Sequence, residues 1–140
     1  MAANGPIILI EDDADDVHIF EQIMKDIKVE NEVVTFITCS AAMDYLVTTK
    51  QKPFLIVCDI NLPEQNGLDF KKQVDENPYL RRKSIPFIFY STSTNIHDVN
   101  KAYTEMSTQG FFAKCADFEE GRELWKTIIA YWKKCCHPNT

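Results

Sequence analysis

Four short apolar runs in this sequence are each followed at once by side chains that can do chemistry. These side chains are carboxylates, hydroxyls and one amine, at Glu11, Asp12, Asp13, Asp59, Ser91, Thr92, Ser93 and Lys114. Taken one at a time, an aspartate or a serine more often caps a helix, and a lysine is more often solvated. Four such coincidences at the ends of apolar runs instead favour one shared site.

The residue types suit chemistry on a phosphoryl group. Carboxylates gathered in one place repel one another unless a cation is bound, and Mg²⁺ prefers hard oxygen ligands and keeps several waters. Beside such an ion, a carboxylate can attack phosphorus as a nucleophile and form an aspartyl phosphate. The charge on the transferred group then needs a cation and a hydroxyl donor, which Lys114 and Ser91 can supply.

The strands that must position these residues are visible as continuous apolar runs. Five runs lack any polar/apolar alternation, at 7–10, 33–37, 54–58, 87–90 and 111–113. Such runs are typical of strands buried on both faces, which a parallel sheet requires. Parallel strands all end at one edge of a sheet, so side chains that are far apart in the sequence would meet there.

Five segments with apolar residues at helical spacing separate or follow these strands. In four of them the apolar stripe is Phe20, Ile23, Met24 and Ile27; Met43, Leu46 and Val47; Ile96, Val99, Tyr103 and Met106; and Leu124, Trp125, Ile128, Ile129 and Trp132. The remaining helix spans 67–77 and should end at Pro78. Asp15 or Asp16 can cap the first helix, and Ser40 the second. Five strands alternating with five helices predict an α/β fold whose parallel sheet is covered on both faces.

Composition favours a single domain over 1–140, with a core at about 7–134 and a short tail at 135–140. Hydrophobic residues make up 45% of the chain and glycine plus proline total only ten, which argues against disordered and fibrous proteins. The net charge of −6 disfavours binding to nucleic acid. The one basic cluster, at Lys71, Lys72, Arg81, Arg82 and Lys83, is predicted to be a solvated face.

We expect a cytoplasmic protein that does not bind membranes. No apolar run approaches the roughly 20 residues that a membrane-spanning helix needs. The first residues also lack the basic region and cleavage site of a secretory signal.

The cysteines favour core packing over disulfides or metal binding. Five cysteines, an odd number without metal-ligand spacing, argue against a disulfide framework. Cys39, Cys58 and Cys115 lie in or beside apolar stretches, where cysteine usually acts as a small core residue. The consecutive side chains Cys135, Cys136 and His137 cannot easily enclose one ion, so no metal site is predicted there.

Four segments, taken together and in order, give a specific resemblance. ILIEDDADD, LIVCDINLPEQNGLDF, IPFIFYSTS and GFFAK resemble the signature segments of the response-regulator receiver family of two-component signalling, over roughly residues 7–134. The resemblance implies a flavodoxin-like (βα)5 doubly wound fold, with a five-stranded parallel sheet in the order 2-1-3-4-5. The region around 77–86 further resembles small single-domain receivers that accompany bacterial sensor kinases.

The same resemblance assigns a role to each candidate site residue. Asp59 matches the phosphoacceptor. Glu11 and Asp12 match the acidic pair that binds Mg²⁺ together with Asp59, with Asp12 the favoured direct ligand. Asn61 matches the position that gives its backbone carbonyl to the metal. The phosphate-binding and switch residues are matched by Ser91 for the hydroxyl, Lys114 for the lysine and Phe111 for the aromatic.

Two positions depart from the family pattern. Family members usually place a proline after the lysine, often with a cis peptide, whereas Cys115 follows Lys114 here. A cis bond before a residue other than proline costs about 2.5–4 kcal/mol, so we expect a trans peptide at this position. The switch aromatic is Phe111 where tyrosine is common, so it can rotate inward but has no hydroxyl to offer.

The leading hypothesis is a stand-alone phosphorylation switch or phosphorelay intermediate, not a conventional enzyme. Its phosphoryl donor would be a sensor histidine kinase or a histidine phosphotransfer protein. Its output would pass to an unknown downstream protein, because little chain follows Lys134.

Three alternatives are weaker. A phosphohydrolase of the haloacid-dehalogenase type wants a second aspartate two residues after the nucleophile, where this chain has Asn61. A receiver-like module that never takes phosphate would not need the complete set of acidic, hydroxyl and lysine residues. A nucleotide-binding protein would need a glycine-rich loop after the first strand.

Overall fold

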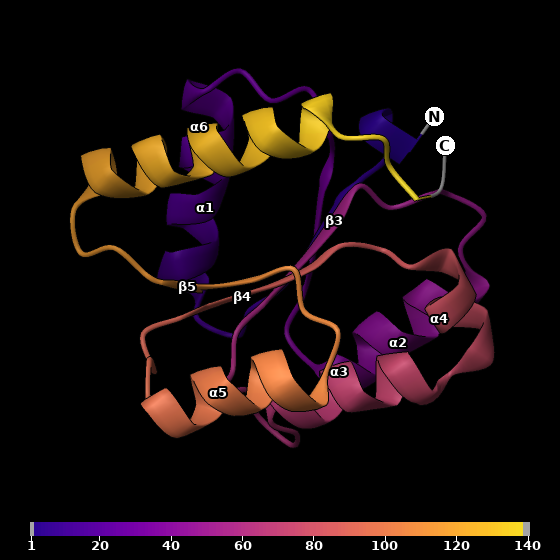
Figure 1. Ribbon diagram of the computed structural model, residues 1–140. Coiled ribbons are helices and arrows are strands. Elements are labelled where there is room, and N and C mark those ends of the chain that lie inside the picture. The colour runs from indigo at the N-terminus through magenta and orange to yellow at the C-terminus, as the bar shows by residue number, and fades with distance from the viewer. Residues whose placement is uncertain (1, 139–140) are drawn as a thin grey trace.

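The central sheet is built from the continuous apolar runs that the sequence displays. The computed structural model describes residues 2–138 of the chain (Figure 1). The strands, all parallel, are β1 (Ile7–Ile10), β2 (Val33–Phe36), β3 (Leu55–Cys58), β4 (Phe87–Ser91) and β5 (Gly110–Ala113). They lie side by side in the order β2-β1-β3-β4-β5. The predicted fold class and strand order are therefore confirmed.

The alternation of side chains along each strand divides the core into two clusters. In β1, Ile8 and Ile10 belong to one buried cluster, whereas Ile7 and Leu9 belong to the other. Successive side chains of a strand point to opposite faces of the sheet, so a strand that is covered on both faces must be apolar at every position. This requirement explains why the strand runs show no polar alternation.

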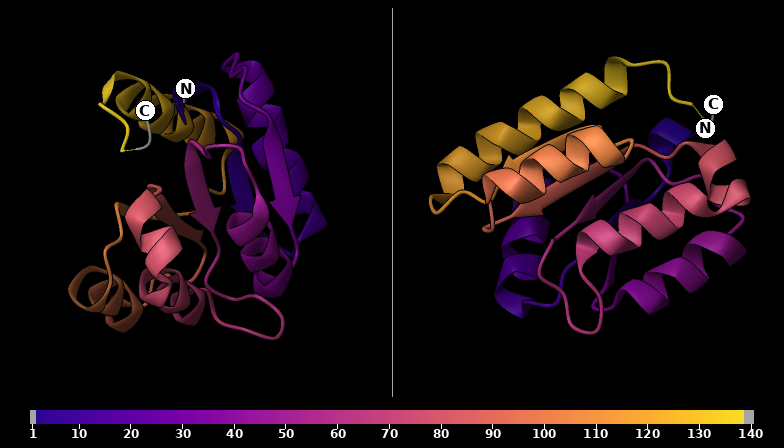
Figure 2. Two further views of the ribbon diagram at one scale, coloured as in Figure 1. Left: turned by 90° about the vertical axis from the view of Figure 1, so that its right-hand side faces the viewer. Right: turned by 60° about the horizontal axis from the view of Figure 1, so that its bottom comes forward.

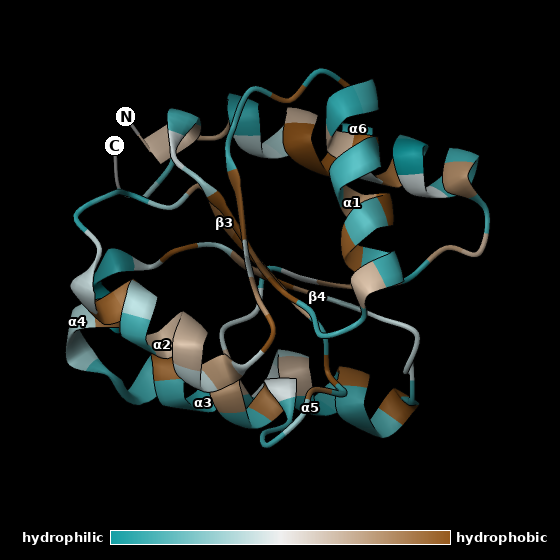
Figure 3. Cartoon of the chain, turned by 180° about the vertical axis from the view of Figure 1, so that it is seen from behind, coloured by the Kyte–Doolittle hydropathy of each residue, from teal (hydrophilic) through white to brown (hydrophobic). Residues whose placement is uncertain are grey.

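Helices cover both faces of the sheet, as Figures 1 and 2 show. The helices are α1 (Ala14–Asp26), α2 (Cys39–Thr48), α3 (Gly67–Glu76), α4 (Pro78–Lys83), α5 (Ile96–Glu105) and α6 (Phe118–Lys134), and a 3-10 turn spans Ala2–Asn4. On one face α1 and α6 bury Phe20, Ile23 and Trp125 against the sheet. On the other face α2 to α5 close over the second cluster. Seen from behind, β3 is largely hydrophobic, whereas the helices carry a mixture of hydrophilic and hydrophobic residues (Figure 3).

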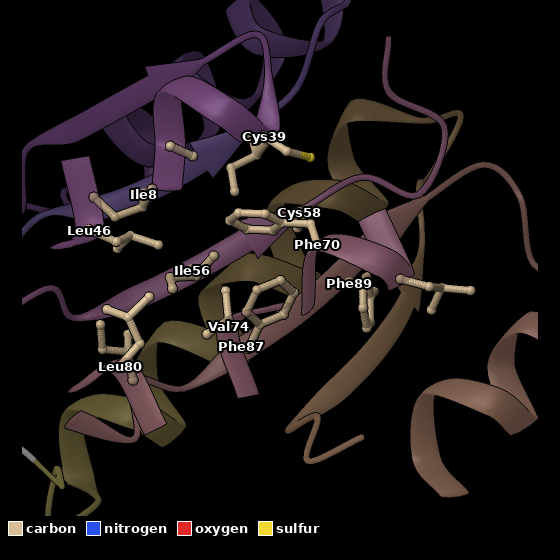
Figure 4. Packing of buried hydrophobic residues seen from close by; sticks show 14 of the residues in the cluster. Ile8, Cys39, Leu46, Ile56, Cys58, Phe70, Val74, Leu80, Phe87 and Phe89 are labelled. Atoms are coloured by element: carbon tan, nitrogen blue, oxygen red, sulfur yellow. The ribbon is translucent and has the colours of Figure 1, made fainter. Parts of the chain in front are cut away.

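Aromatic rings fill the cluster beneath α3. Figure 4 shows Phe70 of α3 beside Phe87 and Phe89 of β4. The ring centroids of Phe70 and Phe87 lie 6.1 Å apart, and those of Phe87 and Phe89 lie 5.2 Å apart. All three side chains are fully buried. This packing fixes α3 against the sheet directly after the loop that follows β3.

Two helix caps differ from the sequence prediction. The side chain of Asp13, not of Asp15 or Asp16, accepts hydrogen bonds from the first turn of α1. At α2 the cap is Thr38, whose hydroxyl accepts from the backbone N–H of Ala41, and Ser40 lies inside the helix. Each predicted cap therefore lay two or three residues to the C-terminal side of the observed cap.

Pro78 starts a helix instead of only ending one. Asn77 closes α3 and also caps α4, because its side chain accepts from the N–H groups of Tyr79 and Leu80. Proline suits the first helical position, where the missing N–H is not needed. Among residues 2–138 the chain thus has six α-helices, one more than predicted.

The prediction that Lys71 is solvated was wrong. Its side chain is only 5% exposed, its Nζ lies 2.6 Å from an Asp75 carboxylate oxygen, and it stands 5.0 Å above the Phe87 ring. A lysine can bury its methylene stem along apolar surface when its ammonium finds a partner. Lys72, Arg81 and Arg82 are exposed as expected.

The two ends of the described chain both contact the core. Ala2 is fully buried, and His137 is buried with its Nε2 2.8 Å from the carbonyl oxygen of Phe54. The predicted limits of the core at 7–134 remain a prediction. No helix within the described residues is long and apolar enough to cross a membrane.

The five cysteines are free thiols, and two of them lie in the core as predicted. Cys39 and Cys58 are buried, whereas Cys115 is only partly buried. Burial raises the pKa of Cys39 to about 11 and raises the pKa of Cys58 as well. Both thiols are therefore protonated at neutral pH and behave as small apolar side chains.

Candidate functional site

The site lies where β1 and β3 end, at the centre of the sheet. These neighbouring strands are in register from Ile7 and Leu55 through Ile10 and Cys58, so the residues that follow them emerge side by side. The backbone N–H of Asp59 donates to the carbonyl oxygen of Ile10 over 3.1 Å. Strand order reverses at this point, because β1 connects outward to β2 on one side while β3 connects to β4 on the other, and ligands of open α/β sheets bind at such a position.

Three carboxylates gather at this point as the sequence predicts. Glu11, Asp12 and Asp59 each offer an oxygen, and these oxygens lie within 4.8 Å of one another. Glu11 and Asp59 are buried and Asp12 is exposed, so the cluster opens to water on one side. A hydrated Mg²⁺ prefers a few carboxylates and several waters, and this donor set fits that preference.

Asn61 lies two residues beyond Asp59 and is exposed in the loop before α3. That place is compatible with a backbone carbonyl directed to a metal, and the assignment of this carbonyl as a ligand remains a prediction.

Lys114 reaches the carboxylates from the end of β5. Its ammonium forms hydrogen bonds with Glu11, with Asp59 at 3.0 Å and with Asp16 at 2.8 Å. Burial alone would lower the pKa of Lys114, but the hydrogen bonds with its carboxylate partners raise it above the ordinary value. The side chain is therefore a permanent cation at neutral pH, directed at Asp59.

Burial acts on Glu11 in the opposite sense. It raises the pKa of this carboxyl group from 4.5 to about 7, against the lowering effect of the hydrogen bond from Lys114. A buried carboxylate close to other acidic groups is costly without a cation. A divalent ion bound at this cluster would favour the charged form of Glu11.

The two oxygens of Asp59 have different partners. Its Oδ1 accepts a hydrogen bond from the following backbone N–H, that of Ile60, at 2.7 Å, and its Oδ2 accepts from Lys114. The loop beyond is closed by Gly67, whose N–H donates to the carbonyl oxygen of Ile60 over 2.8 Å. These contacts hold the carboxylate at the mouth of the site.

The chain matches a known family over most of its length. Residues 7–126 match the family model described as "Response regulator receiver domain". The chain belongs to this family. Its receiver fold places the acidic pair after β1, an aspartate after β3 and a lysine after β5 in one pocket, and that pocket fits a phosphoacceptor aspartate.

Relatives of the receiver include proteins of phytochrome signalling. The chain is 27% identical to the response regulator Rcp1 of Synechocystis sp. over 131 residues, which cover 90% of this chain and 87% of Rcp1. A crystal structure of the phosphorylated cyanobacterial phytochrome response regulator RcpA has a TM-score of 0.82 and 28% identity, and covers 92% of this chain and 94% of that one. The Mn²⁺-bound form of Rcp1 has a TM-score of 0.78 and 26% identity, and covers 91% of this chain and 94% of that one.

The candidate hydroxyl residue, Ser91, lies at the end of β4. Ser91 is fully buried, and its Oγ accepts a hydrogen bond from the N–H of Ser93 at 3.1 Å. Its carbonyl oxygen accepts from the N–H of Lys114 at 2.9 Å, which ties the end of β4 to the residue that follows β5. Movement of the Ser91 backbone would therefore act directly on the backbone of Lys114.

Phe111 lies on the neighbouring strand, partly buried against Phe89 with the ring centroids 5.5 Å apart. Its backbone N–H donates to the hydroxyl of Tyr103 over 3.1 Å. Ser91 pairs with Ala113 in the sheet, two residues along β5 from Phe111. The hydroxyl and the aromatic ring are therefore on adjacent strands, and their role as switch residues remains a prediction.

Two further observations concern the surroundings of Lys114. The peptide bond before Cys115 is trans as expected, since no cis peptide occurs in the part of the chain that the structure describes. Asp16, which contacts Lys114, was considered from the sequence only as a helix cap. Its place in the first turn of the helix after the acidic pair is the signal that could have identified it.

Proposed function

We propose that this receiver accepts a phosphoryl group on Asp59 in a Mg²⁺-dependent reaction and acts as a signalling switch. The observation that supports this most strongly is the position of the Asp59 carboxylate, which belongs to the acidic cluster and at the same time lies 3.0 Å from the Lys114 ammonium. A phosphoryl group on this carboxylate would therefore lie close both to the acidic cluster and to a fixed cation.

The residues of the chain would divide the work of the transfer. A carboxylate oxygen of Asp59 attacks phosphorus, the bond between phosphorus and the donor's leaving atom breaks, and the leaving atom keeps the electron pair. Glu11, Asp12, Asp59 and the Asn61 carbonyl would hold Mg²⁺, which would neutralise charge on the phosphoryl oxygens. Lys114 and Ser91 would stabilise the remaining oxygens, as a preorganised cation and a hydroxyl donor. The phosphorylated RcpA and the Mn²⁺-bound Rcp1 support both parts of this proposal.

The partners follow from the family and the site. Receivers of this family obtain phosphoryl groups from histidine kinases, and we propose a sensor histidine kinase or a histidine phosphotransfer protein as the donor here. The output would pass by protein–protein contact to a downstream protein. We propose a cytoplasmic, single-domain receiver that takes part in its own phosphorylation and dephosphorylation without being a conventional enzyme.

Labelling with acetyl phosphate tests the phosphoacceptor. With Mg²⁺, wild-type protein should gain one acyl phosphate that hydroxylamine removes, because a carboxyl-bound phosphoryl group is a mixed anhydride. Asp59→Ala should abolish the label. Asp44→Ala, which removes an exposed carboxylate from α2, should leave it intact. Full hydroxylamine-sensitive labelling of Asp59→Ala would contradict the assignment.

The switch makes a second prediction, for Ser91→Ala. Phosphate adds charge and acceptor oxygens near Ser91 and Lys114, so the hydroxyl should move toward it and free space beside Phe111. Amide NMR of free and beryllofluoride-bound wild-type protein should then show large shifts around Phe111. Ser91→Ala should still bind beryllofluoride but give much smaller shifts there. Equal shifts in both proteins would show that the Ser91 hydroxyl does not carry the signal.

A further inference from the structure

Lys114 is held by three carboxylates that come from three different parts of the chain. Glu11 follows β1, Asp59 follows β3, and Asp16 lies in the first turn of α1. A lysine ammonium has three N–H donors and no acceptor, so these partners use its whole capacity. Glu11 and Asp59 belong to the acidic cluster, whereas Asp16 does not. The chemistry proposed above requires the first two and leaves the third without a role.

The position of Asp16 follows from the start of α1. Asp13 caps this helix by accepting from the N–H groups of Asp15 and Asp16, which fixes the first turn against the end of β1. Negative side chains are favoured in a first helical turn, because they complement the positive end of the helix dipole. The Asp16 side chain is 36% exposed, against 5% for Glu11 and 9% for Asp59. It therefore forms the outer wall of the lysine pocket.

The contact of Lys114 with Asp16 does not draw it away from Asp59. The same ammonium position lies 2.8 Å from an Asp16 oxygen and 3.0 Å from an Asp59 oxygen. The backbone of Lys114 is fixed separately, by its N–H bond to the carbonyl oxygen of Ser91. No proline follows the lysine to stiffen the loop, because the next residue is Cys115. The ammonium of the long side chain is thus held by its hydrogen bonds with the three carboxylates.

The partners of Lys114 should change when the site is loaded. Mg²⁺ and a phosphoryl group would engage the oxygens of Glu11 and Asp59, and so take two of the three partners from the lysine. Asp16 lies outside the acidic cluster and can keep its contact throughout. We infer that Asp16 is a positioning residue, whose ion pair with Lys114 holds the ammonium beside the phosphoryl group on Asp59. This inference rests on the proposed function.

Affinity for beryllofluoride, an analogue of the phosphoryl group, tests the inference. At saturating Mg²⁺, Asp16→Asn should weaken beryllofluoride binding about three- to tenfold, the range expected for a charge-assisted contact at a partly exposed position. Asp15→Asn is the matched control: it removes the same charge from the same turn, and Asp15 forms no ion pair in the described part of the chain. The control should bind beryllofluoride as wild type does, and Asp16→Glu should restore part of the affinity.

A second measurement separates positioning from a general electrostatic effect. Mg²⁺ affinity without beryllofluoride should fall slightly and equally in Asp16→Asn and Asp15→Asn, because each variant loses one negative charge. Thermal melting of the apo forms checks that both variants are folded. Equal beryllofluoride affinities in the two variants would overturn the inference. It would also be overturned if the Mg²⁺ affinity of Asp16→Asn fell by the same factor as its beryllofluoride affinity. Failure of the wild-type protein itself to bind beryllofluoride would instead overturn the proposed function.

Discussion

Gly67→Ala is expected to destabilise the protein by about 3 kcal/mol and to slow phosphoryl uptake, because an added Cβ would enter space held by backbone. The Cβ would lie 2.1 Å from the carbonyl oxygen of Asp59 and 3.1 Å from the Cα of Ile60. Backbone atoms of a buried strand end cannot rotate away as a side chain can. Relief would require either the start of α3 or the peptide after Asp59 to move, and the second displaces the phosphoacceptor.

Gly121→Ala is the matched control for this substitution. The nearest atom to its Cβ would be the end of the Ile23 side chain, at 3.1 Å, and a side-chain tip can shift by a few tenths of an ångström. The other neighbours, Tyr90 and Cys115, would lie at ordinary contact distances of 3.9 and 4.0 Å. Urea unfolding should show a loss of less than about 1 kcal/mol for Gly121→Ala. Acetyl phosphate labelling should be slowed in Gly67→Ala and unchanged in the control. Equal stability and equal labelling of the two variants would show that α3 can move without disturbing Asp59.

The sheet could be predicted from the sequence because its physical requirement is simple. A strand such as β1 or β3, covered on both faces, needs an apolar side chain at every position, and four such residues in a row are conspicuous. The ends of these runs then locate Asp59 and Lys114 at one edge without any knowledge of packing. The strands and the main polar groups of the site follow from local pattern, whereas the strand order was implied by the resemblance to the receiver family.

The helix ends were harder to predict because several residues compete for each cap. Asp13, Asp15 and Asp16 are all competent N-caps, and only the path of the chain after β1 selects the first of them. At Asn77 the sequence contains a stop signal and a start signal at the same position, since Pro78 ends one helix and suits the first turn of another. Local propensity leaves such choices open.

The contacts missed at the sequence level depend on how far long side chains reach. Lys71 was expected in water, yet its ammonium lies over the Phe87 ring and pairs with Asp75. Asp16 contacts Lys114, 98 positions away along the chain. The spacing of Lys71 and Asp75, at i and i+4 of one helix, is visible in the sequence, but the burial of the lysine is not. The contact of Asp16 with Lys114 leaves no such trace, because a flexible lysine can reach partners in several directions. The structure is needed to show which partner is within reach.

Trp125→Ala is expected to destabilise the receiver by about 3–5 kcal/mol, a large share of the total stability of a small domain. The side chain is fully buried in the cluster beneath α1 and α6. It meets Phe20 edge-on at 5.0 Å and Tyr90 edge-on at 5.1 Å, measured between ring centroids. Truncation would leave a cavity between a helix and the strand that ends at Ser91, and the rigid neighbours could fill it only in part.

Trp132→Ala removes a side chain of the same kind two turns further along the same face of α6, where it is only partly buried. Trp132→Ala should lower the free energy of unfolding by less than half as much as Trp125→Ala, since both the lost apolar area and the cavity are smaller. Urea unfolding of the two variants followed by circular dichroism gives the comparison, without reliance on tryptophan fluorescence. Because Tyr90 directly precedes Ser91, the Trp125 variant should also show broadened amide signals at the end of β4. Equal losses of stability in the two variants would mean that α6 is not anchored to the sheet through Trp125.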